Sequence, residues 1–396
     1  MTRKIKPPVL ADRRYLDRLI SAPGFTSISA SIISIILGLI LGFILLIIID
    51  ASSATIGMAD LLTYGFSSAG RIAKVLYKAA PLMLTGLSIG FAFRTGLFNI
   101  GATGQYTVGA FFGLFAAIIW KFPWWAAILV AMLVGAIWGA IPGFFNAYFN
   151  VNEVITAIMC NWIALFLCNL VFFNTPDMWV NASDRSRTVN VATANASGLL
   201  PKLGLDQLLG SSYANIGIFI AIIIAVLIYV ILEKTTFGYE LKACGLNKHA
   251  SVYAGIKSKR NIVFAMMIAG GLAGIGGAIS YLAGTVDFTI SSTTLLPMGF
   301  NGIPVALLAF SNPLGIIASS IFIGFLQVGG EAMQPEFSAE MVNVILSVII
   351  YFSAFSLIMR GVVTKLLKRK GSKEQNEDPE GPIDPTPVSE TKGVEN

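Results

Sequence analysis

The sequence predicts an all-α polytopic membrane protein with about ten transmembrane helices, some of them short or broken. Of its 396 residues, 55% are hydrophobic and only 12% are charged, about half the charge of an average soluble domain. The mean hydropathy is +0.76. Several uncharged runs also reach the length of about 20 residues that an α-helix needs to cross a bilayer.

Ten apolar segments are candidate spans within a single transmembrane domain, residues 27–370. They cover residues 27–49, 79–93, 104–120, 123–145, 154–173, 215–232, 261–284, 298–310, 313–330 and 341–360. The second, eighth and ninth are short or interrupted by Gly and Pro. Non-helical backbone at membrane depth persists only where protein covers it or where it lines a cavity, so these three are expected near a pathway.

The distribution of Lys and Arg predicts the orientation. Six lie within the first 20 residues, six between Glu233 and Asn261, and seven from Arg360 onward. Cytoplasmic loops are enriched in Lys and Arg, and ten spans put these three segments on one side. Both termini, including the N-terminal segment 1–26, and the loop 233–260 are therefore expected in the cytoplasm. The loop 174–214, with three basic residues, is expected outside.

Two further segments have a distinct composition. Segment 50–78 places Arg71, Lys74 and Lys78 on the outer side, a mild exception to the charge rule, and its pattern predicts an amphipathic surface helix. Residues 371–396 are acidic and proline-rich and have almost nothing to bury, so a disordered cytoplasmic tail is expected.

Glycines recur at spacings of four within the spans. The pairs and triplet are Gly38 and Gly42, then Gly135, Gly139 and Gly143, then Gly270 and Gly274. This spacing puts small residues on one helix face and predicts close helix packing. A gating role for the run AGGLAGIGGA is the alternative.

Catalytic and metal-binding motifs are missing from the sequence. It has one histidine and contains no HExxH, CxxC, GxSxG or GxxxxGK[ST] pattern. The chain is therefore expected to be non-catalytic, with no cofactor and no metal site. The three cysteines are expected to be buried rather than disulfide-bonded. Because the basic residues cluster beside apolar runs, they indicate membrane topology and contact with lipid, not nucleic-acid binding.

Few ionisable residues lie near the spans, and Glu153 is the most notable. One interpretation is an interfacial carboxylate at a helix N-terminus, where the helix dipole favours it. The other is a lock or gate residue near Asn150, Asn152 and Asn161. Because coupled carriers usually have ionisable groups inside the membrane, a proton- or sodium-coupled carrier has little support.

Segment 233–260 divides into two parts. Its first half, up to Leu246, shows no sustained helical period. A short helix is then predicted, with Asn247 as N-cap and Gly255 as the stop. It comprises Asn247, Lys248, His249, Ala250, Ser251, Val252, Tyr253, Ala254 and Gly255. A helix this short is not stable alone in water, so it either docks on a partner or belongs to a loop whose charges only set topology.

Four stretches carry a family resemblance across the whole membrane region: residues 78–111, 149–165, 235–256 and 299–315. In them the chain resembles the permease subunits of bacterial ABC importers of the ribose/branched-chain amino acid permease family. Within it, the chain looks like the branch that imports nucleosides with a basic-membrane-protein-type lipoprotein. The same stretches contain five polar candidates for the translocation path or a gate: Asn99, Gln105, Glu153, Asn161 and Asn301.

The resemblance implies a function and a set of partners. The short helix 247–255 would be the coupling helix that docks on a separate cytoplasmic ABC ATPase, of tandem type. A second, different permease would complete a heterodimer in the bacterial plasma membrane. An extracellular lipoprotein would deliver the nucleoside, and alternating access would move it. An importer of ribose or another simple sugar is the alternative, and a stand-alone secondary carrier is the second.

Overall fold

The computed structural model describes residues 23–175, 179–181, 184–289, 294–334, 336–355, 358–359 and 361. Most of the predicted segment 1–26 and the whole predicted tail 371–396 lie outside these residues. The described part of the chain contains no β-strand and only two isolated bridges, Val180–Thr188 and Arg187–Thr289. The all-α prediction is confirmed.

Ten apolar helices match the predicted spans in order within the described ranges. They are α2 (Pro23–Ile49), α4 (Ala69–Arg94), α5 (Ala102–Ile118), α6 (Trp124–Phe149), α7 (Glu153–Phe173), α10 (Gly217–Lys234), α13 (Ser258–Leu282), α14 (Met298–Leu308), α15 (Pro313–Ala332) and α16 (Ala339–Ala354). Seven of them are long and apolar enough to cross a membrane, whereas α5, α14 and α16 are shorter.

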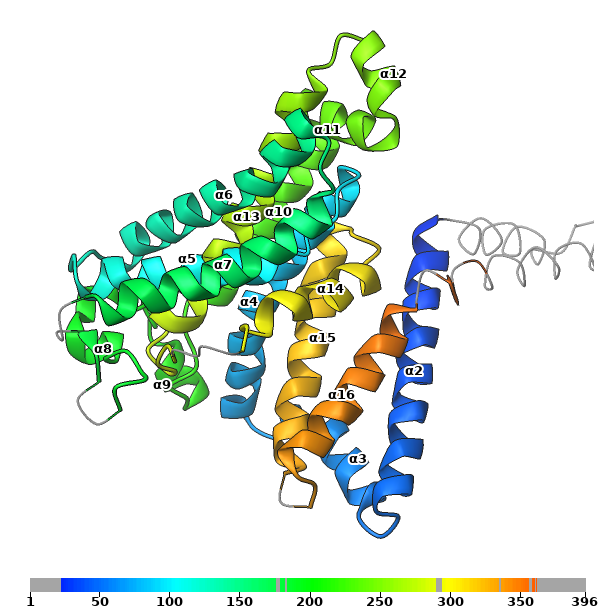
Figure 1. Ribbon diagram of the computed structural model, residues 1–396. Helices are drawn as coiled ribbons and strands as arrows, with labels where there is room; N and C mark the ends of the chain where they lie inside the picture. Colours follow the sequence, from blue (N-terminus) through cyan, green and yellow to red (C-terminus); the bar gives the residue numbers. More distant parts are fainter. Residues whose placement is uncertain are drawn as a thin grey trace, which may run out of the picture.

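Short helices fill the connections. They are α3 (Ala54–Thr63), η1 (Tyr64–Phe66), α8 (Val191–Ala194), η3 (Ala196–Gly198), α9 (Leu205–Leu209), α11 (Thr236–Leu246) and α12 (Lys248–Tyr253). Helices α11 and α12 lie at one end of the bundle, and α3, α8 and α9 lie at the other (Figure 1). We call these the α12 end and the α9 end. The loops 233–260 and 174–214 thus lie at opposite ends, and the assignment of the first to the cytoplasm stays a prediction.

Helix α13 is the centre of the bundle and packs against α4, α5 and α6. Its contact with α6 is made by glycines, because a Cβ atom added at Gly270 would lie 2.2 Å from the Gly135 carbonyl oxygen. Helices α2 and α16 meet in the same way, with Gly38 against the Ile349 carbonyl. The predicted close packing is therefore confirmed, since only glycine lets these backbones approach so far.

The glycine-rich middle of α13 is packed on all sides rather than free to bend. The helix is continuous from Ser258 to Leu282. A Cβ atom at Gly274 would lie 2.3 Å from the Ala131 carbonyl oxygen, and one at Gly277 would lie 2.3 Å from the Tyr106 carbonyl oxygen. This geometry favours the packing interpretation over the gating alternative.

Two expectations about the spans are wrong. The second span is not short, because α4 runs for 26 residues and includes Pro81; transmembrane helices tolerate proline where neighbouring helices cover the backbone. The ninth span, α15, is a continuous helix of 20 residues. The expectation holds for the eighth, α14, which has 11 residues and contains Pro304.

The predicted surface helix in segment 50–78 is also wrong, because this segment divides between α3 and the first turns of α4. The α4 lysines are not solvated on a surface helix. Lys74 and Lys78 both pair with the carboxylate of Glu331 on α15. Their charge is therefore compensated at the α9 end, which sequence patterning alone did not reveal.

Helix α11 corrects the expectation that residues 233–246 have no helical structure. The Thr235 hydroxyl caps it and accepts a hydrogen bond from the Gly238 N–H at 3.1 Å. A Cβ atom at Gly238 would lie 2.1 Å from the Ile231 carbonyl oxygen, so glycine lets α11 fold back against α10. Buried Leu241 then supplies tertiary packing that offsets the low helix propensity of glycine.

Candidate functional site

Helix α12 has the boundaries that its capping residues predict. The Asn247 side-chain oxygen accepts a hydrogen bond from the Ala250 N–H at 2.9 Å and caps the N-terminus. The helix ends at Tyr253, and Gly255 follows with a φ of +80°. That left-handed conformation strains any residue with a side chain, so glycine is favoured there.

One face of α12 is attached to the bundle. The hydroxyls of Ser251 and Ser258 lie 2.8 Å apart, and both side chains are buried. Lys248 Nζ donates to the Asn150 side-chain oxygen at 3.3 Å, in the connection between α6 and α7. Movement of α12 is therefore expected to reach the start of α13 and the α6–α7 connection.

The opposite side of α12, together with Leu246 at the end of α11, is exposed and mostly apolar. Tyr253 is 94% exposed, Leu246 is 90% exposed and Val252 is 57% exposed. With exposed Ala250 and Ala254, these residues form a surface that we call the α12 patch. An apolar patch at the polar end of a membrane protein is typical of a surface that contacts another protein.

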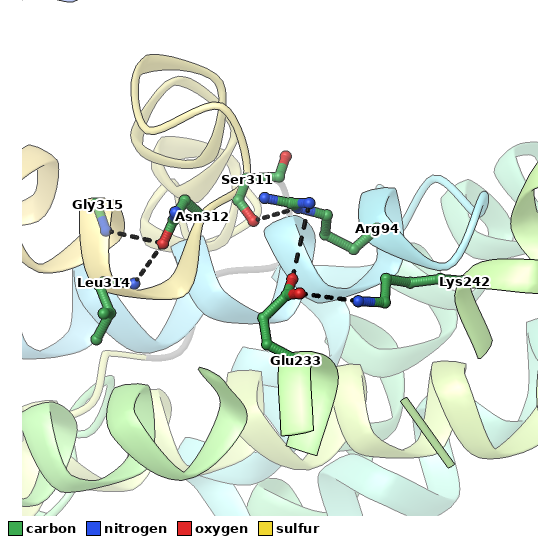
Figure 2. A network of polar contacts seen from close by, with 7 residues as sticks. All are labelled: Arg94, Glu233, Lys242, Ser311, Asn312, Leu314 and Gly315. Atoms are coloured by element: carbon green, nitrogen blue, oxygen red, sulfur yellow. Dashed lines mark hydrogen bonds and ion pairs between the residues drawn. The ribbon is translucent and has the colours of Figure 1, made fainter. Parts of the chain in front are cut away.

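A polar cluster around Glu233 joins four elements at the α12 end of the bundle (Figure 2). The Glu233 carboxylate accepts a hydrogen bond from Lys242 Nζ of α11 at 2.9 Å and lies 3.9 Å from Arg94 Nη1 at the end of α4. Arg94 Nε donates to the Ser311 carbonyl oxygen at 3.1 Å, next to the start of α15. The Glu233 cluster thus ties α4, α10 and α11 to the α14–α15 turn.

Gly96 and Gly245 form a second contact beneath α12, between the segment after α4 and α11. Gly96 has a φ of +74°, and a Cβ atom added there would lie 2.3 Å from Gly245 Cα. A Cβ atom at Gly245 would lie 2.5 Å from the Thr95 carbonyl carbon. Because the two backbones are in direct contact, a movement of α11 is expected to displace the segment 95–101.

The segment 95–101 returns into the bundle and carries a buried amide network. Asn99 Nδ2 donates to Gln105 Oε1 at 2.7 Å and to Ser88 Oγ at 3.0 Å, and Gln105 Nε2 donates back to Asn99 Oδ1 at 3.0 Å. None of these side chains is more than 1% exposed. Because buried polar groups are costly unless paired, this network holds the non-helical segment in position.

Asn161 of α7 extends the same region. Its side-chain oxygen accepts a hydrogen bond from the Gly104 N–H at 2.8 Å, and its Nδ2 donates to the Ile100 carbonyl oxygen at 3.1 Å. It is 2% exposed. The structure thus brings Asn99, Gln105 and Asn161 together around the break between α4 and α5, and they satisfy one another or the backbone.

Glu153 lies apart from this network. It is the first residue of α7, and Asn152 caps that helix by accepting from the Val154 N–H. Asn146 Nδ2 donates to the Glu153 carboxylate at 2.8 Å. This position matches the helix-terminus interpretation, because the dipole favours a carboxylate there. A gating role for Glu153 stays a prediction.

Asn301 lies in a third place, on α14. With residues of α16 it lines a groove of about 510 Å³. Its neighbours there include Ser347 and Tyr351, which sequence reasoning did not select. The signal that would have found them is the spacing of four between polar residues within an apolar run. The five candidate path residues therefore occupy three separate locations.

The described residues contain no group of three or more His, Cys, Asp or Glu side chains that would hold a metal ion. All three cysteines, Cys160, Cys168 and Cys244, are buried.

Comparison with known proteins gives consistent similarities. A family model described as branched-chain amino acid transport system/permease component matches residues 71–354. The guanosine ABC transporter permease NupP of Bacillus subtilis is 34% identical over 334 residues, which cover 83% of this chain and 93% of NupP. The nucleoside ABC transporter permease NupB of Lactococcus lactis is 35% identical, with 80% and 88% covered.

A further relative comes from the same Bacillus subtilis strain as NupP. The guanosine ABC transporter permease NupQ is 27% identical over 264 residues, which cover 64% of this chain and 79% of NupQ. No solved structure matches the chain.

Proposed function

We propose, from the premise that this chain belongs to the permease-component family of branched-chain amino acid transport systems, that it is the membrane subunit of an ATP-driven nucleoside importer. The observation that carries this proposal is the identity of 34–35% with NupP and NupB over most of each chain. Both relatives are named as permeases for guanosine or nucleosides. The bundle of apolar helices supports a role as a multi-pass translocation subunit.

The importer would contain three further components. They are a cytoplasmic ABC ATPase of tandem type, a second and different permease, and an extracellular lipoprotein that delivers the nucleoside. The similarity to both NupP and NupQ, two guanosine permeases of one strain, supports a pair of unlike permeases. The proposed location is the bacterial plasma membrane, with the α12 end in the cytoplasm.

Helix α12 is the proposed coupling helix. The exposed α12 patch would dock on the ATPase, while the buried Ser251–Ser258 contact would transmit the movement to α13. A second route runs through α11. Gly245 of α11 contacts the backbone of Gly96, which belongs to the segment that carries Asn99. Closure of the ATPase on ATP would thus switch the spans between inward-open and outward-open states.

The test is uptake of labelled guanosine into proteoliposomes that contain both permeases, the ATPase and the lipoprotein. Uptake is expected only with ATP and with all components present, and unlabelled nucleosides should compete whereas ribose should not. The control is the same complex with an ATPase variant that cannot hydrolyse ATP. Guanosine uptake by this chain without the other components would instead show a secondary carrier. If ribose reduces the uptake and unlabelled nucleosides do not, the complex is a sugar importer.

A further inference from the structure

A polar stripe runs along the exposed face of α16. Between Asn343 and Phe352, the exposed side chains of this helix are Asn343, Val344, Ser347 and Tyr351. The three polar residues follow one another at intervals of four, so they lie above one another on one helix face. The opposite face of α16, with Ile345 and Ile349, is buried.

Two other spans of the same bundle, α2 and α10, expose only apolar side chains over most of their lengths. On α2, between residues 29 and 49, the exposed residues are Ile32, Ile33, Ile36, Ile40, Ile44, Ile47, Ile48 and Ile49. On α10, up to Leu232, they are Phe219, Ile223, Val226, Leu227 and Val230. Such faces suit lipid, where unpaired polar groups are costly. The stripe on α16 therefore faces water or protein rather than lipid.

A groove lies between this stripe and α14. It has a volume of about 510 Å³, and its lining includes Asn301, Pro304, Ser347, Tyr351 and Phe355. Helices α14 and α16 pack against each other in the fold. Along α16 the hollow continues past Asn343 and Val344, with a further volume of about 490 Å³.

The polar groups of this groove are available to a ligand. Neither the Asn301 amide nor the Asn343 amide hydrogen-bonds to another side chain in the part of the chain that the structure describes. The Ser347 hydroxyl donates to the Asn343 carbonyl oxygen at 2.7 Å and keeps its lone pairs as acceptors. The Tyr351 ring is 61% exposed and contacts the rings of Phe352 and Phe355.

We propose that this groove is one half of the nucleoside-binding path. An exposed aromatic ring stacks on a nucleobase whatever its identity, and amides pair with the donors and acceptors of the base edge. The hydroxyl and amides also suit the ribose. The groove is open along its side, and the second permease would close it. This inference rests on the proposed importer function and adds the position of the nucleoside.

The first test is thiol labelling of Ser347→Cys in the full complex, after Cys160, Cys168 and Cys244 of this chain are replaced by Ala. Only a thiolate reacts, and a thiolate needs water. A membrane-impermeant maleimide should therefore label Ser347→Cys, and guanosine should slow the labelling. Ile223→Cys is the control: Ile223 is 66% exposed on the apolar face of α10, and the cysteine should stay unlabelled. Asn343→Cys provides a second position on the stripe.

Two results would overturn the proposal. If neither Ser347→Cys nor Asn343→Cys is labelled, no water reaches this face of α16 and the groove is not part of a nucleoside path. If labelling occurs but guanosine does not slow it, the groove is a water-filled crevice without a nucleoside site. Guanosine uptake by the unaltered complex is measured in parallel. Intact uptake with failed labelling contradicts only the groove, whereas absent uptake contradicts the importer function itself.

A second measurement uses the aromatic ring. Tyr351→Ala should raise the guanosine concentration for half-maximal uptake about tenfold, the loss expected for one base stack. Tyr351→Phe should restore it, because the ring is kept. Equal uptake kinetics in Tyr351→Ala and the unaltered complex would contradict a stacking role.

Discussion

Asn99 and Gln105 form two hydrogen bonds with each other inside the bundle, and neither residue is more than 1% exposed. Asn99→Ala should lower the free energy of unfolding by about 1–3 kcal/mol, because it leaves a buried amide without its partner. Thermal unfolding in detergent measures this change.

A double-mutant cycle adds the control for that substitution. Gln105→Ala should cost a similar amount, and the double variant should cost less than the two single variants together, because they share one interaction. Asn343→Ala, at an exposed position, should change stability by about 0.5 kcal/mol or less. Strict additivity of Asn99→Ala and Gln105→Ala would contradict the network.

Tyr253 is an almost fully exposed residue of the α12 patch, so its replacement tests docking without a cost in folding. Tyr253→Asp should abolish association with the ATPase while the melting temperature stays the same, because the side chain is 94% exposed and packs on little of this chain. Co-purification with the ATPase is the measurement.

Leu208→Asp is the matched control for Tyr253→Asp. Leu208 is 77% exposed and lies in α9, at the opposite end of the bundle. Binding of the ATPase should therefore be unaffected by this change. Equal binding by both variants would show that α12 is not the docking element.

At the scale of elements, α11 is the link between α12 and the break after α4. Gly245→Ala should abolish uptake while the ATPase still binds, because the added Cβ would press on the backbone of Thr95 and Gly96. ATP-driven guanosine uptake and ATPase co-purification are measured on the same sample.

Gly210→Ala serves as the control for Gly245→Ala. It lies at the end of α9 with a φ of +59°, and a Cβ atom there would meet nothing within 4 Å. This variant should keep full uptake and lose only a little stability through backbone strain. If Gly245→Ala transports as well as Gly210→Ala, coupling does not pass through the contact with Gly96.

Substitutions at the α6–α13 interface can distinguish two roles of the α13 glycines, close packing and bending of the helix. Gly270→Ala should reduce the yield and thermal stability of the folded protein, because the new Cβ would lie 2.2 Å from the Gly135 carbonyl oxygen. Gly271→Ala should be tolerated, since its Cβ would make an ordinary contact of 3.4 Å with Met132. Normal stability of Gly270→Ala with loss of uptake would favour a hinge instead.

For the whole molecule, the two ends of the bundle should lie on opposite sides of the membrane. A cysteine at Tyr253 should react with an impermeant reagent only from the cytoplasm, and one at Leu208 only from outside. The physical reason is the accumulation of Lys and Arg in and around segment 233–260. The reverse pattern would contradict the orientation, and labelling from both sides would show a mixed topology.

The lysines of α4 show why the distribution of Lys and Arg alone predicts the structure of segment 50–78 incorrectly. Lys74 and Lys78 look like exceptions at the α9 end, but Glu331 of α15 neutralises part of their charge. The carboxylate is more than 250 positions away from either lysine in the sequence. No local pattern connects these residues, and so the segment 50–78 was misread as a surface helix.

The spans and α12 were predictable because their causes are local. Lipid offers no hydrogen bonds to the backbone, so an uncharged run of sufficient length must be helical. The boundaries of α12 follow from Asn247, which caps an N–H only three residues away, and from Gly255 with its positive φ. Helix α11 was missed because its stability comes from packing on α10 rather than from its own sequence.

The sequence by itself determined the number, order and approximate ends of the apolar helices and the existence of a short capped helix between two spans. Only the tertiary structure decided which polar residues meet. Arg94 reaches Ser311 across 217 positions, and Asn161 reaches Gly104 across 57. Hydropathy and capping act within one or two turns, whereas these contacts depend on how whole helices pack. For that reason the groove between α14 and α16 emerged only in three dimensions.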